Sequence, residues 1–365
     1  MAKLGAIATY INGYAFKPSD WSDQGLPIIR IQDLTGNSYQ ANRYNGKYDA
    51  KYEVVSGDVL ISWSASLGIY VWNGEKALLN QHIFKVVFDK VDVDKSFFIH
   101  QLEAILERAK KDAHGATMKH LTKPVFDALP FYLPSKEKQI QIATKLNMVC
   151  ELISQRKTQL NNLEELVKSR FIELFGDLKA NPYNWECKNL LDVADIDTVM
   201  VNDYEKYADY PHIGIDSIEK NTGRLVGYRT IAEDGVISGK YLFTDKHIIY
   251  SKIRPNLNKV ALPNFEGLCS ADAYPILPKE NVCLRVYLGY VMRSEFFLDY
   301  ILPFSRRANM PKVNKEQLSG FVLPVPDIAT QNQFATFVEQ TDKLKFDCLS
   351  SIKSLLFISN KIQRD

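Results

Sequence analysis

Two short segments of the chain are near copies of each other across a long interval of sequence. ATMKHLTK begins at residue 116 and ANMPKVNK begins at residue 308, 192 positions later. At that spacing and without a gap, eight of the 29 positions from 116 to 144 match their counterparts, including Gln139 with Gln331. Average composition would give roughly two. Solenoid repeats are about 20–50 residues long, so this longer period indicates two copies of a whole domain.

The composition is typical of a globular protein. Of 365 residues, 46% are apolar and 24% are charged, so two or three domains with hydrophobic cores are expected. No run of 18 apolar residues predicts a membrane span, and the first residues lack the pattern of a signal peptide. The five cysteines are scattered and odd in number, which favours free thiols in a reducing cytoplasm.

Each copy ends in a long helical pattern with a narrow apolar stripe. The first pattern follows a candidate N-cap at Ser135 and ends at Gly176, and the second follows Asp327. The apolar spacing is that of a coiled-coil seam. The first stripe comprises Ile142, Leu146, Val149, Ile153, Leu160, Leu163, Val167 and Leu174, and the second comprises Phe334, Phe337, Thr341, Leu344, Cys348, Ile352, Leu355, Ile358 and Ile362.

A narrow stripe of this length needs a partner helix. We expect the two helices, each about 40 residues and about 60 Å long, to pair with each other in antiparallel fashion. The alternative is that each helix packs only on its own domain.

The remaining sequence predicts two mixed domains, because short β-rich runs alternate with turn dipeptides and with helical stretches near 94–111 and 284–301. The expected fold class is α+β: two α/β domains in a pseudo-two-fold repeat, separated by an antiparallel coiled coil of two long helices. The expected boundaries are 1–134 for the first domain, 135–176 for its helix, 177–326 for the second domain and 327–365 for its helix.

Basic residues cluster locally although the net charge is only +2. Three segments, 108–126, 246–265 and 300–315, are rich in lysine and arginine, and the last two contain no acidic residue. A charged run is usually a solvated surface. Two of these segments lie on the repeated motif, and that recurrence favours a shared function.

No constellation of catalytic residues is visible. The chain lacks phosphate-binding glycine loops, HExxH, paired CxxC and the GxSxG elbow. Asn181-Pro182-Tyr183 lacks one proline of the tetrapeptide found in amino-methyltransferases, and Glu186-Cys187-Lys188 is only half of a nuclease metal site. We interpret both as structural. Two globular domains with basic, aromatic-rich loops suit binding to DNA. Phosphate contacts would supply the affinity, and contacts to base edges would supply the sequence specificity.

Several motifs, in their order and duplication, resemble the specificity subunit of type I restriction–modification systems across essentially the whole chain. They are INGYAFKPSDW with GLPIIRIQDL, the strand GDVLISW, the pair ATMKHLTK and ANMPKVNK with the helix starts LPSKEKQIQI and VPDIATQNQF, and KTQLNNLEELVKSRFIELFGD followed by NPYNWE. The first domain has no tryptophan-containing lead-in like NPYNWE, which leaves the packing of its first residues open.

The resemblance implies that each globular domain is a target recognition domain for one half of a bipartite DNA sequence. The helices would set the gap between the halves and dock methyltransferase (modification) subunits, one near each domain. Those subunits would bind S-adenosylmethionine and methylate N6 of a flipped adenine. A separate restriction and translocase subunit would use ATP and Mg. This chain would carry no catalytic residue, metal or cofactor of its own.

Candidate DNA contacts are basic residues for phosphates and polar residues beside aromatic rings for bases. The phosphate candidates are Lys119, His120, Lys123, Lys252, Arg254, Lys259, Arg306, Arg307, Lys312 and Lys315, and the base candidates are Asn12, Tyr14, Lys17, Arg30, Gln32, Ser62, Ser64, Asn256 and Asn309. Trp63 fits either a core position or a stacking platform.

Two other classes of protein remain open at this stage. A free-standing DNA-acting enzyme, such as a nuclease with an unrecognised site, would cleave or modify DNA alone in the presence of magnesium. A structural adaptor with incidental basic loops would bind neither DNA nor a methyltransferase. The duplication of the basic loops argues against the adaptor.

Overall fold

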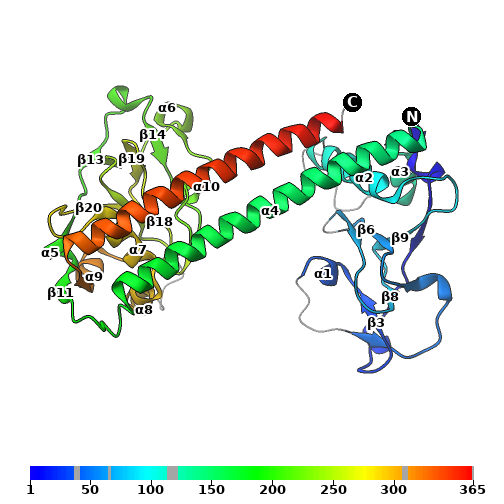
Figure 1. Cartoon of the computed structure of the whole chain (residues 1–365), viewed down its shortest axis with the longest axis horizontal. Coiled ribbons are helices and arrows are strands. Elements are labelled where there is room, and N and C mark those ends of the chain that lie inside the picture. Colours follow the sequence, from blue (N-terminus) through cyan, green and yellow to red (C-terminus); the bar gives the residue numbers. More distant parts are fainter. Residues whose placement is uncertain (37–41, 65–66, 113–121, 306–310, 364–365) are drawn as a thin grey trace. The chain divides into compact units, whose positions relative to one another are not determined.

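The computed structural model describes residues 1–36, 42–64, 67–112, 122–305 and 311–363. The chain forms two compact units: unit 1 is Met1–Arg156 with Ser350–Asp365, and unit 2 is Lys157–Leu349. Two long helices, α4 (Lys136–Phe175) and α10 (Ile328–Ile362), each begin in one unit and end in the other (Figure 1). Each unit is therefore built from both long helices.

Unit 1 contains two four-stranded sheets among its described residues. The first has the order β2 (Thr9–Asn12), β9 (Ile83–Val87), β6 (Val59–Ser62), β7 (Gly68–Val71), and the second has the order β4 (Arg43–Tyr44), β3 (Leu26–Ile29), β8 (Ala77–Leu79), β5 (Glu53–Val54). A short pair joins β1 (Ala2–Lys3) to β10 (Pro130–Phe131), and the shorter helices are α1 (Ile31–Leu34), α2 (Lys95–Asp112) and α3 (Lys123–Ala128).

Unit 2 repeats this plan within its described residues. One sheet has the order β12 (Ala194–Ile196), β20 (Ala273–Pro278), β17 (Ile248–Ser251), β18 (Val260–Ala261), and the other has β13 (Met200–Val201), β16 (Lys240–Phe243), β19 (Gly267–Ser270), β14 (Pro211–Ile213), β15 (Arg229–Thr230). The pair of β11 (Glu186–Asn189) with β21 (Val322–Val325) corresponds to β1 with β10, and the shorter helices are α5 (Leu190–Val193), α6 (Ile231–Asp234), α7 (Arg285–Arg293), α8 (Glu295–Ile301) and α9 (Lys315–Ser319).

Strand direction repeats as well. β3 pairs parallel with β8 in unit 1, and β14 pairs parallel with β19 in unit 2, whereas the other described strand pairs are antiparallel. Apart from the additional strand β13 in unit 2, the strand order and the single parallel step are the same in both units. This agreement confirms the duplicated, mixed α/β fold that the sequence predicted.

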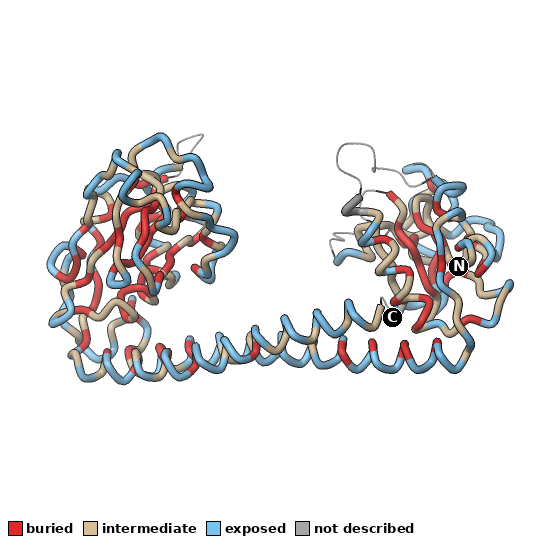
Figure 2. Tube along the Cα trace, turned by 90° about the horizontal axis from the view of Figure 1, so that it is seen from above, coloured by how far each residue is buried: buried red, intermediate tan, exposed pale blue. Residues whose placement is uncertain are grey.

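The central strands β6 and β17 are apolar at successive positions because both faces of their sheet are covered. Side chains alternate between the faces of a strand. Val59 and Ile61 point to a core shared with α2 and α4, whereas Leu60 points to a core shared with the second sheet. In β17, Tyr250 and Ile249 divide in the same way. Both strands are buried, and Figure 2 shows the buried segments, in red, inside each unit.

A buried glutamine fixes the start of α4 to unit 1. The Gln139 side chain is 2% exposed. Its Oε1 accepts from the Asp94 backbone N–H at 2.8 Å, and its Nε2 donates to the Pro134 carbonyl at 2.9 Å. Asp94 immediately precedes α2. One side chain therefore joins the first turn of α4 to the start of α2.

The equivalent glutamine does the same for α10 in unit 2. Gln331 is fully buried, its Oε1 accepts from the Leu284 backbone N–H at 2.7 Å, and its Nε2 donates to the Pro326 carbonyl at 2.7 Å. Leu284 immediately precedes α7. The repeated glutamine and the proline five residues before it are thus identical in both copies because they make the same buried junction.

The long helices pack against each other in opposite directions. Within unit 1, Ile362 near the end of α10 packs on the core that contains Ile142 near the start of α4. Within unit 2, the Phe171 ring near the end of α4 contacts the Phe334 ring near the start of α10, with centroids 5.2 Å apart. The expected antiparallel pairing is therefore confirmed. None of the described helices is long and apolar enough to cross a membrane.

Two residues of the predicted α10 stripe lie outside the seam. Leu344 and Ile358 are 51% and 44% exposed, whereas Thr341 and Cys348 are buried. A helix turns about 100° per residue. Leu344 is therefore about 60° from Thr341, and Ile358 is about 80° from Cys348, so the actual seam is narrower than the sequence pattern suggested.

We predict that Gln331→Ala destabilises unit 2 by about 2–3 kcal/mol, because it leaves buried backbone groups without partners. Gln333, which is exposed on the same helix, provides the control: Gln333→Ala should change stability by less than about 0.5 kcal/mol. Native-state hydrogen exchange of the Leu284 amide reports the effect directly. Equal protection in both variants would show that the junction does not hold the helix.

Candidate nucleic-acid interface

Several residues of unit 2 that the sequence predicted as DNA contacts lie just after β17. Residues 252–254 run antiparallel to residues 311–313, because the Lys252 carbonyl accepts from the Val313 N–H and the Arg254 N–H donates to the Pro311 carbonyl, both at 2.8 Å. This pairing brings together four side chains that the sequence predicted as DNA contacts. We call them the basic ridge: Lys252, Arg254, Asn256 and Lys312.

Lys252 and Lys312 share one aromatic and one acidic neighbour. The Lys252 Nζ lies 4.9 Å from the Tyr274 ring centroid, a cation–π distance. The Lys312 Nζ pairs with Asp272 Oδ1 at 2.8 Å. Burial and then the charge of Lys312 lower the pKa of Lys252. The two ammonium groups repel each other and the Asp272 carboxylate attracts both, so an anion bound beside them would relieve the repulsion.

Arg254 is held in a left-handed conformation with φ +49°, which costs a non-glycine residue about 1–2 kcal/mol. The following Pro255 is buried, and Asn258 is buried with its Nδ2 donating to the Arg293 carbonyl at 2.7 Å. The anchored turn leaves Arg254 and Asn256 exposed. The Arg254 guanidinium has no ion-pair partner among the described residues. Such a group can bind a phosphate or the edge of a guanine.

Three predicted lysines instead bind their own unit. The Lys259 Nζ donates to the Ile215 carbonyl at 2.7 Å, and only 11% of its side chain is exposed. This bond holds the Lys259 ammonium inside unit 2, so the structure gives the predicted phosphate contact no support. The repeated pair is also engaged, since Lys123 donates to Asp127 Oδ2 at 2.7 Å and Lys315 donates to the Ile196 carbonyl at 3.1 Å.

Two serines that the sequence predicted as base contacts are buried. Ser62 is fully buried and Ser64 is 8% exposed, so the structure gives these predicted contacts no support. The Ser62 hydroxyl donates to the Ser64 carbonyl at 3.2 Å. In unit 2 the Ser251 hydroxyl donates to the Ile253 carbonyl at 3.1 Å. The serine is a structural feature of both copies that shapes the end of the central strand.

This correspondence places Trp63 of unit 1 at the position of Lys252 in unit 2. The Trp63 N–H donates to the His82 carbonyl at 3.2 Å, as the Lys252 N–H does to the Asp272 carbonyl at 3.0 Å. The Trp63 ring stacks on Phe84 with centroids 5.6 Å apart, and its Nε1 donates to Asn12 Oδ1 at 3.2 Å. At this equivalent position, unit 1 therefore carries an aromatic side chain and unit 2 carries a cationic one.

The other candidates of unit 1 are distributed over its second sheet and the loop before it. Tyr14 is 46% exposed and packs against Phe16 and Tyr52. Lys17 is exposed. The Arg30 guanidinium lies 5.4 Å from the Trp21 ring centroid, and Gln32 is half-buried on α1.

Some candidates lie outside the described residues: Lys119, His120, Arg306, Arg307 and Asn309. Tyr274 and Asp272 were missed from the sequence because Tyr274 lies on β20 and Asp272 in the turn before it, and both reach Lys252 only through the pairing of β17 with β20. In the part of the chain that the structure describes, no group of three or more His, Cys, Asp or Glu residues could hold a metal ion.

The sequence matches the family described as type I restriction modification DNA specificity domain twice, over residues 1–165 and 182–356. Two similar proteins are specificity subunits of Escherichia coli restriction enzymes. The EcoDI subunit is 28% identical, over 77% of this chain and 70% of its own length, and the EcoBI subunit is 29% identical, over 92% and 78%.

The fold is also shared with a solved structure, the type I restriction–modification S subunit from M. genitalium. The TM-score is 0.59 at 13% identity, and the match covers 99% of this chain and 94% of the other. The duplicated topology, the paired helices and the two family matches agree. The chain belongs to the family of DNA specificity subunits of type I restriction–modification systems.

Proposed function

We propose that each unit reads one half of a bipartite DNA target. The observation that carries this proposal is the equivalence of Trp63 and Lys252, which puts different chemistry at the same place in two copies of one fold. Two identical readers would recognise two copies of one half-site. Two units with different side chains at the equivalent position would instead recognise two different half-sites, which together form an asymmetric, bipartite DNA target.

We assign residues 1–134 and 177–326 to the target recognition domains, and 135–176 and 327–365 to the helices that set the gap between half-sites. The helices would also dock methyltransferase subunits, with a restriction and translocase subunit completing the complex in the cytoplasm. S-adenosylmethionine, ATP and Mg would then be bound by those partners. The role of this chain is to bind and orient the DNA.

Within unit 2, the basic ridge is the proposed DNA contact. Its lysines would neutralise phosphates, and displaced counterions would make binding depend on salt. Arg254 and Asn256 are the exposed side chains with the donors needed for base edges. In unit 1, Asn12, Tyr14 and Lys17 beside Trp63 are the corresponding proposal, together with Arg30 and Gln32.

The direct test is selection of bound sequences from a random DNA pool by the chain assembled with its modification subunits. The proposal predicts one enriched motif with two specified halves and an unspecified gap of fixed length. A continuous motif, or no enrichment by an assembled complex, would refute it. Incubation of the purified chain alone with DNA and magnesium checks the nuclease alternative, for which we expect no cleavage.

We predict that Arg254→Ala weakens DNA binding and reduces the slope of log affinity against log salt by about one. Lys246 is a matched control, because it is exposed at the opposite end of β17 and pairs with Glu280 at 3.0 Å. Lys246→Ala should leave the slope unchanged. Fluorescence anisotropy between 50 and 300 mM salt, a range set by the steep dependence of such complexes, measures both. Identical slopes for wild type and Arg254→Ala would remove Arg254 from the interface.

Asp272→Asn should have the opposite effect. Removing the carboxylate frees Lys312 for phosphate, so affinity should rise several-fold at low salt and the salt slope should become steeper. Asp245→Asn, at the far end of β17 and exposed, removes the same charge and is the control for a general change in net charge. If both variants strengthened binding equally, the effect would not come from the basic ridge.

A further inference from the structure

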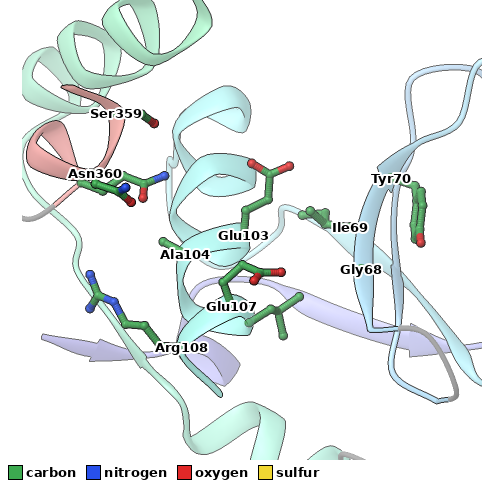
Figure 3. Close-up of a pocket in the computed structure, with 11 residues that line it drawn as sticks. Gly68, Ile69, Tyr70, Glu103, Ala104, Glu107, Arg108, Ser359 and Asn360 are labelled. Carbon is green, nitrogen blue, oxygen red and sulfur yellow. The ribbon is translucent and has the colours of Figure 1, made fainter. Parts of the chain in front are cut away.

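A hollow in unit 1 is unsuited to a phosphate group. It has a volume of about 580 Å³, and Glu103, Glu107 and Arg108 of α2 line it (Figure 3). Two carboxylates against one guanidinium make this surface negative, so it would repel a DNA backbone. Further DNA contacts are therefore expected where exposed cations lie apart from carboxylates, and unit 2 has such a place beside the basic ridge.

A hairpin of residues 218–225 lies directly beside the basic ridge. Near its turn, the Asn221 backbone N–H is shared between the carbonyls of Leu257 and Asn258, at 3.2 Å from each. These two carbonyls belong to the turn that begins at Arg254. A backbone contact therefore joins the hairpin to the exposed donors of the basic ridge.

Gly223 makes this close approach possible. Its φ is +68°, a conformation that glycine adopts without a steric penalty. A methyl group on its Cα would overlap the Val260 carbonyl. That carbonyl already accepts from Arg293 Nε at 2.9 Å, and the Arg293 carbonyl accepts from Asn258 Nδ2 at 2.7 Å. The hairpin and the anchored turn thus share one hydrogen-bonded support, which a side chain at position 223 would displace.

The carboxylate of the hairpin is occupied within the hairpin itself. Glu219 Oε2 accepts from the Thr222 hydroxyl at 2.6 Å, and its Oε1 accepts from the Arg224 guanidinium at 2.9 Å. These bonds, the Thr222 hydroxyl first, lower the pKa of Glu219. The carboxylate therefore stays ionised near neutral pH and bound to its own hairpin.

Lys220 and Asn221 present free side chains, and we call them the hairpin tip. Both are exposed. Within the part of the chain that the structure describes, neither side chain has a hydrogen-bond or ion-pair partner. A lysine ammonium can neutralise a phosphate, and an asparagine amide offers both the donor and the acceptor that an adenine edge requires.

We propose that the hairpin tip is a second DNA-reading element of unit 2, with Lys220 on a phosphate and Asn221 on a base edge. Gly223 is the positioning residue that sets it beside the basic ridge. This inference rests on the proposed function, in which unit 2 reads one half-site. The sequence did not indicate these residues, because they lie outside the three basic segments and outside the repeated motif.

The phosphate contact is tested by the salt dependence of binding of the full-length chain to one fixed DNA duplex. Lys220→Ala should reduce the slope of log affinity against log salt by about one. Lys246→Ala, at the opposite end of β17 and paired with Glu280, should leave the slope unchanged. Equal slopes for wild type and Lys220→Ala would overturn the phosphate contact.

The base contact is tested by selection from a random DNA pool with the chain assembled with its modification subunits. Asn221→Ala should weaken the preference about tenfold at one or two positions. Those positions should lie in the half-site that Asn256→Ala also changes, while the other half-site and the gap stay the same. An unchanged motif, or a change in the other half-site, would overturn the base contact.

Asn264 provides the matched control for this substitution. It is an exposed asparagine of the same unit, and it lies toward the start of β17, at the opposite end from the basic ridge. Asn264→Ala should therefore select the wild-type motif. If Asn264→Ala relaxed the same positions as Asn221→Ala, the change would not come from the hairpin tip.

The positioning role is tested by comparing two glycines in left-handed conformations. Gly223→Ala should relax the same base positions as Asn221→Ala, because the added methyl group displaces the hairpin tip. Gly235 has φ +56° and open space around it, so Gly235→Ala adds similar backbone strain without the overlap and should keep the wild-type motif. A wild-type motif from folded Gly223→Ala would overturn the positioning role.

Unfolding temperatures identify a variant that fails to fold. If Gly223→Ala unfolds, Asn221→Ala, which changes only an exposed side chain, must still relax the base preference for the proposal to stand. If the wild-type complex selects no split motif, the proposed function fails. The hairpin tip is then judged by the salt slope of Lys220→Ala, which needs no specific sequence.

Discussion

The structure depends on one buried glutamine in each copy. Gln139 and Gln331 join the first turn of a long helix to the backbone that opens another helix of the same unit. A buried amide without partners costs about 1–3 kcal/mol per lost group, so each junction holds the first turn of its long helix to its own unit. The glutamine and the proline five residues before it are identical in both copies because they make this junction.

Around that fixed frame the two units differ in what they expose. The serine that shapes the end of the central strand is buried in both copies, yet the next residue is Trp63 in one and Lys252 in the other. A duplicated scaffold with unlike surfaces can read two unlike half-sites while it retains one architecture.

Much of the fold could be predicted from sequence because the repeat and the helical stripes are local or periodic. The identities at Gln139 and Gln331 indicated the duplication, but their buried role became visible only with their backbone partners. The site was harder to predict. Ser62 and Lys259 have the polarity of DNA contacts, yet they lie inside because the central sheet is covered on both faces and because a lysine can reach a buried carbonyl. Asp272 and Tyr274 join the basic ridge only through strand pairing. No pattern in a single segment carries that information.

The measurement that tests the account most directly is the methylome of a methylation-free host that expresses this chain with its modification subunit. Native DNA would be sequenced for N6-methyladenine. The account predicts a single split motif, methylated on both strands, whose two halves differ and whose gap has one length. An assembled complex that leaves the DNA unmethylated, or that methylates a continuous or palindromic motif, would contradict the claim that two unlike units of one chain each read half of the target.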